Sequence, residues 1–379
     1  GPPGRLARGA RPPTSMLGLT DAAVLDALKS VRDPDVDRDI VSLGFVKDVR
    51  IADASVALTL QLTTPACPFK ERLRDETVAV LRRLGASHVD VTLTAVVRPG
   101  GGGGEIGRAP IPGVKNVIAV GAGKGGVGKT TTAVNLAVSL SQFGARVGLL
   151  DADLYGPNVP IMLGIKTQLQ TDGKRILPAE KFGLQIVSIG FLASDDSPII
   201  WRGPLLHGAI RQFFHEVAWD DLDYLVVDMP PGTGDIALTL SQRVPLTGAI
   251  IVTTPQDIAL IDAKKGLTMF EKVGVPILGI VENMAVHVCT NCGHVEHIFG
   301  AEGGKRMAAE YKVDYLGALP LTMKIREQAD SGRPTVVAEP EGEVAALYRQ
   351  VARTVAVKIA AKAKDFSSKF PTITVSKGT

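Results

Sequence analysis

The sequence predicts an α/β protein built on a doubly wound, mostly parallel sheet and preceded by a small α+β domain. Three observations predict this arrangement. Continuous apolar runs alternate with helix-length segments over the last two thirds of the chain, a glycine-rich turn motif follows the first of these runs, and five consecutive glycines separate this region from a shorter one. Strands of a parallel sheet are continuously apolar because crossover helices cover both faces.

Length and composition exclude several classes of protein. At about 150 residues per domain, the 379 residues predict two or three domains. With 45% hydrophobic and 21% charged residues the chain is typical of a globular protein, and its net charge of +3 gives no basic stripe for nucleic acid. No apolar run approaches the roughly 20 residues that span a bilayer, so we expect no membrane partner. Three cysteines with one close pair form no disulfide framework and favour a reducing compartment, the cytoplasm.

Shifts in composition divide the chain. The segment RPGGGGGEIGRAPIPG, residues 98–113, cannot hold the interior of a helix or strand and is predicted to be a flexible Gly/Pro-rich linker. It separates an α+β domain at 16–97 from an α/β domain at 114–360, which is followed by a tail at 361–379. Residues 1–15 lack both an acidic residue and the apolar stretch of a secretory signal, so we expect a disordered leader; an organellar transit peptide is the alternative.

The elements of both domains follow from their periodicity. In the small domain we expect helices at 20–31, where Thr20 can cap the first turn, and at 68–84, with strands at 44–51, 55–62 and 89–97. In the large domain, apolar runs predict strands at 116–121, 146–151, 184–190, 223–228, 248–254 and 276–282. Residues 164–183 predict a hairpin insertion. Ligands of such a sheet bind at the carboxyl ends of its strands.

The motif GKGGVGKT follows the run at 116–121 and opens a helical segment, which is the context of a phosphate-binding loop. Glycines let successive backbone N–H groups point at phosphate oxygens, and the helix N-terminus adds its positive end. We expect Lys129 to contact the β and γ phosphates and Thr130 to ligate Mg²⁺. A second lysine, Lys124, suggests a charge aimed at the transferring phosphate, with a solvated lysine as the plain alternative. The predicted nucleotide-binding residues are Gly123, Lys124, Gly125, Gly126, Val127, Gly128, Lys129, Thr130 and Thr131.

Carboxylates follow two of the apolar runs. Asp151 and Asp153 stand at the end of one run, and Asp228 ends another, with Asp235 shortly after a Pro/Gly-rich loop. An aspartate after a buried strand suits Mg²⁺ held through water, and a loop that senses the γ-phosphate must be able to move. Asp228 is the strongest candidate, Asp151 is a further Mg²⁺ ligand, and Asp235 is equally suited to capping the helix that follows.

Two of the three cysteines, Cys289 and Cys292, stand in the segment HVCTNCGHVEH together with His287, His294 and His297. Both thiolates with His294 and His297 could form a zinc site in one chain, since Zn²⁺ accepts two Cys and two His, although the gap between these histidines is short. An iron–sulfur cluster and a thiol redox pair are the other interpretations of this spacing.

The loop with its extra lysine, together with LLDADLYGPNVPIMLG, DMPPGTGD and VENM before CTNC, resembles the Mrp/ApbC family of iron–sulfur cluster carrier ATPases. That family lies within the deviant phosphate-loop class of ParA, MinD and the nitrogenase iron protein. The resemblance covers about residues 113–355 and implies an ATP-dependent homodimer in which Lys124 contacts nucleotide across the interface. It also implies that Asp153 takes part in water activation, that Asp228 is the Walker B carboxylate, and that Asn283 contacts adenine.

The resemblance further implies what completes the thiol site. A [4Fe–4S] cluster takes four thiolates, and two chains related by a two-fold axis offer four where one offers only Cys289 and Cys292. The implied function is an ATP-hydrolysing scaffold that holds a cluster at the homodimer interface and delivers it to apoproteins. We expect slow hydrolysis because water orientation depends on a mobile loop and a dimer.

The small domain carries a resemblance of its own. DPDVDRDIVSLGFV and TTPACPFK are similar to the SufT-like domain often fused to these carriers, and Cys67 matches its reactive cysteine. Cys67 precedes Pro68 at a predicted helix start, where the positive end of the helix lowers a thiol pKa. A transfer thiol is therefore one interpretation, and a buried structural cysteine is the other.

Two rival functions stay open at this stage. A ParA/MinD-like positioning ATPase with a structural zinc site would act on DNA or membrane, and an electron-transfer ATPase would resemble the nitrogenase iron protein. The helix predicted at 343–364 carries Leu347, Val351, Val355 and Ile359 opposite basic residues, as a membrane-surface helix does. We expect this stripe to pack on the sheet instead.

Overall fold

The computed structural model describes residues 19–34, 36–52, 54–100, 109–154, 156–166, 169–191, 208 and 212–367. The chain forms two compact units. One comprises the residues up to Leu62 together with Cys67–Val96, and the other comprises Thr63–Ala66 and the chain from Val97 onward. The predicted leader lies outside the described residues, as do residues 101–108 of the predicted linker and the end of the predicted tail.

The small unit is a three-stranded sheet covered by two helices. Strand β4 (Ser55–Leu62) is central, with β3 (Val46–Ala52) antiparallel on one side and β5 (His88–Ala95) parallel on the other. Its helices are α1 (Asp21–Leu28) and α2 (Lys70–Leu84), and a short pair of strands is formed by β1 (Arg32–Asp33) and β2 (Arg38–Asp39).

Single residues mark the start of one helix and the end of the other in the small unit, and the Thr20 cap was predicted. The Thr20 hydroxyl accepts a hydrogen bond from the Ala23 N–H at 3.3 Å and caps α1. Helix α2 ends at Gly85, which adopts a left-handed φ of 111°. Alternate residues of β4 are buried under the helices, including Leu58 and Leu60. One face of this sheet therefore builds the core.

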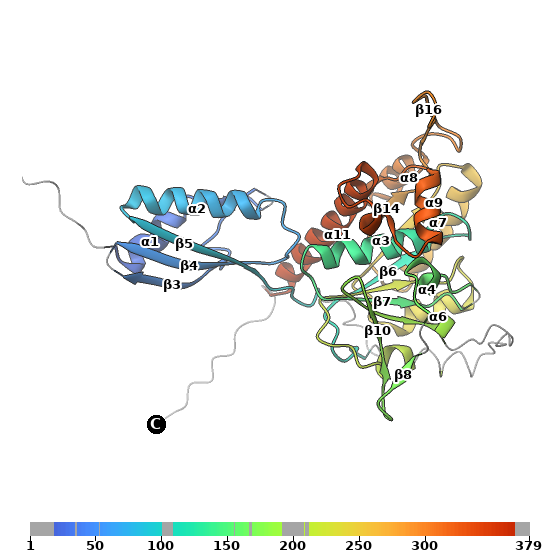
Figure 1. Ribbon diagram of the computed structural model, residues 1–379, viewed down its shortest axis with the longest axis horizontal. Helices are drawn as coiled ribbons and strands as arrows, with labels where there is room; N and C mark the ends of the chain where they lie inside the picture. Colours follow the sequence, from blue (N-terminus) through green and yellow to red (C-terminus); the bar gives the residue numbers. More distant parts are fainter. Residues whose placement is uncertain are drawn as a thin grey trace, which may run out of the picture. The chain divides into compact units, whose positions relative to one another are not determined.

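The large unit is an eight-stranded sheet that is parallel except for one edge strand (Figure 1). In spatial order its strands are β10 (Ala179–Lys181), β11 (Leu184–Ser188), β7 (Val147–Asp151), β12 (Tyr224–Asp228), β6 (Val117–Gly121), β13 (Gly248–Thr253), β14 (Ile277–Glu282) and β17 (Tyr315–Ala318). The six predicted strands are all present. The two edge strands, β10 and β17, were not predicted because they are short and largely half-exposed, so neither has a long apolar run.

Helices cover both faces of this sheet, which confirms the doubly wound architecture (Figure 1). Along β6, Ile118 and Val120 face one hydrophobic core, whereas Val117 and Ala119 face the other. The first core includes α3 (Lys129–Gln142), α4 (Val159–Met162), α10 (Thr335–Ala338) and α11 (Glu343–Ser367). The second includes α6 (Asp235–Arg243), α7 (Asp257–Lys272) and α8 (Gly303–Tyr311).

The stripe of α11 packs into the protein as predicted at three of its four positions. Val351, Val355 and Ile359 are buried in the same core as α3. Leu347 is 40% exposed, so the prediction was wrong there. Packing against the large unit therefore already uses these three positions of the stripe. Within the described residues, no helix is both long and apolar enough to cross a bilayer.

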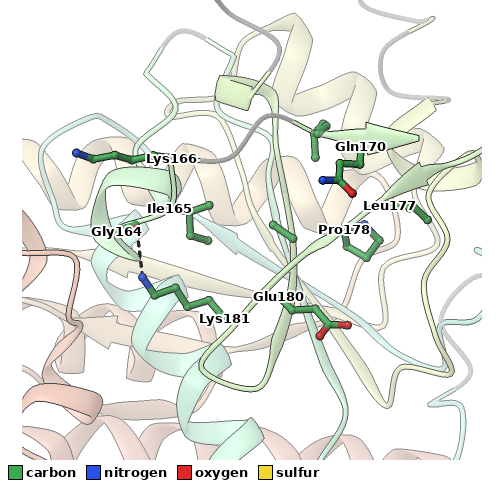
Figure 2. Close-up of a pocket in the computed structure, with 10 residues that line it drawn as sticks. Gly164, Ile165, Lys166, Gln170, Leu177, Pro178, Glu180 and Lys181 are labelled. Atoms are coloured by element: carbon green, nitrogen blue, oxygen red, sulfur yellow. Dashed lines mark hydrogen bonds between the residues drawn. The ribbon is translucent and has the colours of Figure 1, made fainter. Parts of the chain in front are cut away.

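The insertion at 164–183 is a hairpin, as predicted. Strands β8 (Gln170–Thr171) and β9 (Ile176–Leu177) pair antiparallel before the chain enters β10. Between the hairpin and the turn after α4 lies a cavity of about 290 Å³, and the Lys181 ammonium donates to the Gly164 carbonyl across it at 3.0 Å (Figure 2). None of the predicted site residues lines this cavity.

Candidate nucleotide and thiol sites

Three predicted residues converge at the centre of the sheet's carboxyl edge. The Lys129 ammonium donates to Asp228 Oδ1 at 2.6 Å, and the Thr130 hydroxyl donates to Asp228 Oδ2 at 2.7 Å. Lys129 and Thr130 begin α3, whereas Asp228 ends β12, so residues far apart in sequence form one cluster. Asp228 is 0% exposed. Burial raises its pKa, while the charge of Lys129 and the bonds from Lys129 and Thr130 act in the opposite direction.

The loop before α3 has the conformation that its glycines permit. Gly126 and Gly128 adopt left-handed φ values of 80° and 83°. A Cβ on Gly128 would lie 2.0 Å from the Asn283 amide nitrogen, and one on Gly123 would lie 2.0 Å from the Asp262 backbone. In contrast, a Cβ on Gly125 would meet nothing within 4 Å. The loop is therefore packed tightly on its inner side and open where phosphates are expected.

Asp151 is held by the protein itself. Its Oδ2 accepts hydrogen bonds from the Ser188 hydroxyl at 2.9 Å and the Val159 N–H at 3.2 Å, and its Oδ1 accepts from the Asp153 N–H. Burial, followed by repulsion from Asp228 on the neighbouring strand, raises the pKa of Asp151 to about 7. These contacts favour a role in shaping the turn after β7, and direct Mg²⁺ ligation by Asp151 stays a prediction.

The other predicted polar residues surround this centre. The Asp153 carboxylate lies 3.7 Å from the Lys129 ammonium. Lys124 is half-buried, and among the described residues its ammonium has no hydrogen-bond or ion-pair partner. Asp235 is the exposed first residue of α6, whose N-cap is Gly234, so its side chain makes no capping bond. The capping interpretation of Asp235 was wrong.

Asn283 follows β14 and is 6% exposed. Its side-chain N–H donates to the Val127 carbonyl of the phosphate loop at 2.9 Å. The preceding residue, Glu282, was missed at the sequence level although an acidic residue ending an apolar run was the signal used for Asp151 and Asp228. Glu282 is buried and accepts a hydrogen bond from the Gly304 N–H at the start of α8.

Cys289 and Cys292 lie at the tip of a β-hairpin that also leaves β14. Strands β15 (His287–Val288) and β16 (Val295–Glu296) pair antiparallel, and the Cys289 N–H donates to the His294 carbonyl at 2.9 Å. Both thiols are free. Hydrogen bonds from the Cys292 and Asn291 backbone and from the Cys292 thiol lower the pKa of Cys289, which favours the thiolate that binds metal.

The histidines of this segment do not join the thiols. His287 Nδ1 donates to the Leu321 carbonyl at 3.1 Å, and His297 Nδ1 donates to the Ala285 carbonyl at 3.0 Å. His294 points to Glu296, with 3.9 Å between ring nitrogen and carboxylate. In the part of the chain that the structure describes, no three His, Cys, Asp or Glu side chains are grouped so as to hold a metal ion. The four-ligand zinc site considered from the sequence is therefore not assembled within one chain.

Known families match both units. A family model described as NUBPL iron-transfer P-loop NTPase matches residues 113–356, and one described as iron–sulfur cluster assembly protein matches residues 21–93. The chain belongs to this family of iron-transfer P-loop NTPases. The resemblance inferred from the motifs is confirmed, and so is the presence of an assembly-type domain before the NTPase domain.

Curated relatives of this family member carry the name iron–sulfur cluster carrier protein. The relative from Escherichia coli strain K12 is 48% identical over 345 residues, which cover 89% of this chain and 92% of the relative. The relative from Synechocystis is 46% identical over 348 residues, covering 90% and 98%. The relative from Pseudomonas fragi is 52% identical over 276 residues, covering 71% and 94%.

Solved structures confirm the NTPase fold of this family member. A nucleotide-binding protein from Archaeoglobus fulgidus in complex with ADP has a TM-score of 0.54 and 38% identity, covering 62% of this chain and 91% of its own. The cell-division ATPase MinD from Pyrococcus furiosus has a TM-score of 0.50 and 26% identity, covering 64% and 99%.

Cys67 lies in the small unit, just before α2, and is half-buried against the hydrophobic core of that unit. Helix α2 begins at Lys70 rather than at the predicted residue 68, so the thiol is separated from the first helical residue by Pro68 and Phe69. A role for this thiol in transfer stays a prediction.

Proposed function

We propose that this protein is an ATP-hydrolysing scaffold and carrier that binds a [4Fe–4S] cluster between two copies of the chain and delivers it to apoproteins in the cytoplasm. One observation carries the proposal. The predicted phosphate-loop residues meet Asp228 at the carboxyl edge of the sheet, and a hairpin with only two thiols leaves the same edge after β14. A nucleotide site that lacks only a lysine from the partner copy and a metal site that is half complete in one chain both fit a protein whose dimerisation is controlled by ATP.

The nucleotide site supports ATP hydrolysis as follows. Lys129 contacts the β and γ phosphates, and the open backbone of the loop binds the remaining phosphate oxygens. Thr130 and Asp228 fit Mg²⁺, which binds by one or two protein oxygens plus substrate phosphates and water. Bound Mg²⁺ neutralises charge on the phosphates. Asp153 orients the attacking water, and the ammonium of Lys124, which has no partner among the residues that the structure describes, reaches the nucleotide of the partner copy.

The surface supports self-association at this edge of the sheet. Most of the exposed large apolar side chains in the described part of the chain lie on segments that follow the carboxyl ends of the parallel strands, namely Ile161, Ile258, Ile261, Val288, Val295, Ile298 and Met323. Exposed apolar side chains on segments that leave one edge of the sheet fit an interaction site at this edge. This edge meets its own copy across a two-fold axis, so two hairpins approach each other and supply four thiolates.

Anaerobic reconstitution with iron and sulfide tests the cluster site. We expect about one [4Fe–4S] cluster per two chains, with loss of the visible absorption in Cys289→Ser and in Cys292→Ser. Cys67→Ser is the matched control and should load normally because it lies in the other unit. Stoichiometric zinc in each monomer, or a full cluster in a protein that stays monomeric with ATP, would contradict the proposal.

Delivery is tested separately from loading. Loaded protein is mixed with an apo-ferredoxin of the [4Fe–4S] type, and recovery of the ferredoxin spectrum is followed with and without ATP. We expect transfer that depends on ATP, and slower transfer from Cys67→Ser if this thiol assists. A cluster that cycles between oxidation states but never leaves the protein would favour the electron-transfer alternative.

A further inference from the structure

The hairpin that carries the thiols is joined to the phosphate loop by one side chain. Asn283 donates from its amide to the Val127 carbonyl inside the loop at 2.9 Å. Its own backbone N–H donates to the Thr253 carbonyl at 2.7 Å, which continues the pairing of β14 with β13. Because Asn283 also limits the space beside Gly128, a shift of the loop must displace this residue.

The chain between Asn283 and the thiols is held at successive positions. The Ala285 N–H donates to the Leu319 carbonyl at 3.0 Å, and the Leu321 N–H donates to the Val286 carbonyl at 2.8 Å. Ala285 is 4% exposed. The next residues form β15, and the Cys289 N–H closes the hairpin. Because these hydrogen bonds hold residues 283–289 at successive positions, the segment has little freedom to move independently of the sheet.

Two histidines fasten the base of the hairpin. His297, just after β16, donates from Nδ1 to the Ala285 carbonyl, and His287, in β15, donates from Nδ1 to the Leu321 carbonyl. A carbonyl oxygen only accepts, so Nδ1 carries the proton in both rings. The hydrogen bond from His297 therefore connects the chain after β16 to Ala285, which lies two residues after Asn283.

We infer that Asn283 and His297 are positioning residues that fix the thiol hairpin against the phosphate loop, so that nucleotide binding at the loop moves or stiffens the thiols. When the Val127 carbonyl moves, its hydrogen bond to Asn283 moves the start of the hairpin segment. The hydrogen bond from His297 then makes both strands of the hairpin move together. The inference rests on the proposed function for its purpose, namely a cluster affinity that changes with nucleotide. The coupling between the phosphate loop and the hairpin does not itself require a bound cluster.

Amide hydrogen exchange of the hairpin in cluster-free full-length protein tests the link. Exchange of peptides covering residues 284–300 is compared without nucleotide and at saturating Mg-ADP. In the wild type we expect protection to change by about fivefold or more, the lower end of coupling between sites. His297→Ala should lose this response, and His297→Asn should restore it because the asparagine amide places an N–H donor near the position of Nδ1.

His294→Ala is the matched control, because His294 lies in the same hairpin but is exposed and outside the path. It should keep the wild-type response. Asn283→Asp, measured at saturating Mg-ADP, should lose it because a carboxylate cannot donate to the Val127 carbonyl. A wild-type hairpin that does not respond to Mg-ADP, or a full response in His297→Ala, overturns the inference.

The same variants separate this inference from the proposed function. In reconstituted dimers of the wild type, the nucleotide affinity of the cluster-loaded protein should differ from that of the cluster-free protein. In His297→Ala the ratio of these two affinities should approach one. If no cluster loads while the exchange response follows the pattern above, the carrier function fails and the link stands. If clusters load normally and His297→Ala keeps both responses, the link fails and the carrier function stands.

Discussion

Replacing Lys129 by methionine tests the centre of the nucleotide site. Methionine keeps a similar volume and removes the charge, so the variant leaves Asp228 buried without its closest cation. Removing one partner of a buried ion pair costs about 3–5 kcal/mol. The cost is limited because Asp228 can bind a proton, and burial already raises its pKa. We therefore expect Lys129→Met to lower the free energy of unfolding by about 3 kcal/mol at neutral pH.

The pH dependence of this loss has a definite sign. Without Lys129 the pKa of Asp228 in the folded state rises further, so the folded protein holds a proton that the unfolded chain has released. Stability is then greatest at low pH and falls as the pH rises through the folded pKa. Urea unfolding across the pH range should show a steeper fall in Lys129→Met than in the wild type.

A double variant separates stability from catalysis. In Lys129→Met/Asp228→Asn neither buried charge remains, so we expect the double variant to recover at least half of the lost stability. ATP turnover should stay reduced by about 100-fold or more in both variants, because the phosphates lose their lysine. A double variant no more stable than Lys129→Met would refute the ion-pair reasoning, and normal turnover in Lys129→Met would refute the assignment of the phosphate loop.

Three further predictions concern neighbouring residues. Because the pKa of Asp151 is raised to about 7, the free energy of unfolding should fall as the pH rises from about 4 to 7. Asp151→Asn should flatten that slope in urea unfolding. An unchanged slope would argue against a buried proton on Asp151. Gly128→Ala should lower the free energy of unfolding by at least about 1–2 kcal/mol, because of its left-handed φ and its clash with Asn283. Gly125→Ala, where the new Cβ meets open space, should change it by no more than about 0.5 kcal/mol. Equal shifts of the melting temperature in the two variants would contradict this. Lys124→Ala should change the free energy of unfolding by no more than about 0.5 kcal/mol, since no described residue pairs with Lys124. The variant should lose ATP turnover while its monomer still binds nucleotide. Full turnover would contradict a role for Lys124 across the interface.

The sequence predicted the local elements well where a single physical cause dominates. The six central strands are continuously apolar because both faces are buried, and the Thr20 hydroxyl caps α1 as predicted. The edge strands β10 and β17 have no such signal, because a short strand with one half-exposed face resembles a loop in composition.

The candidate site divides in the same way. The motifs predicted that Lys129, Thr130 and Asp228 belong to one site, and the structure brings these three side chains together. The different positions of Asp151 and Asp153 could not be predicted from the sequence: Asp151 ends β7 and Asp153 follows it by two residues, yet only Asp151 is held by Ser188 and the Val159 N–H. Ser188 ends a different strand, so only the sheet order brings it to Asp151.

By itself, the sequence determined the fold class, the phosphate loop and the presence of two thiols in a short segment, because these depend on residue type and spacing along the chain. Only the tertiary structure decided that His287 and His297 bond to backbone carbonyls, that Glu282 anchors α8, and that Asn283 joins the thiol segment to the phosphate loop. Each of these contacts joins a side chain to a backbone group of another segment. Every residue offers such backbone groups, so no pattern of residue types reveals which of them will be the partner.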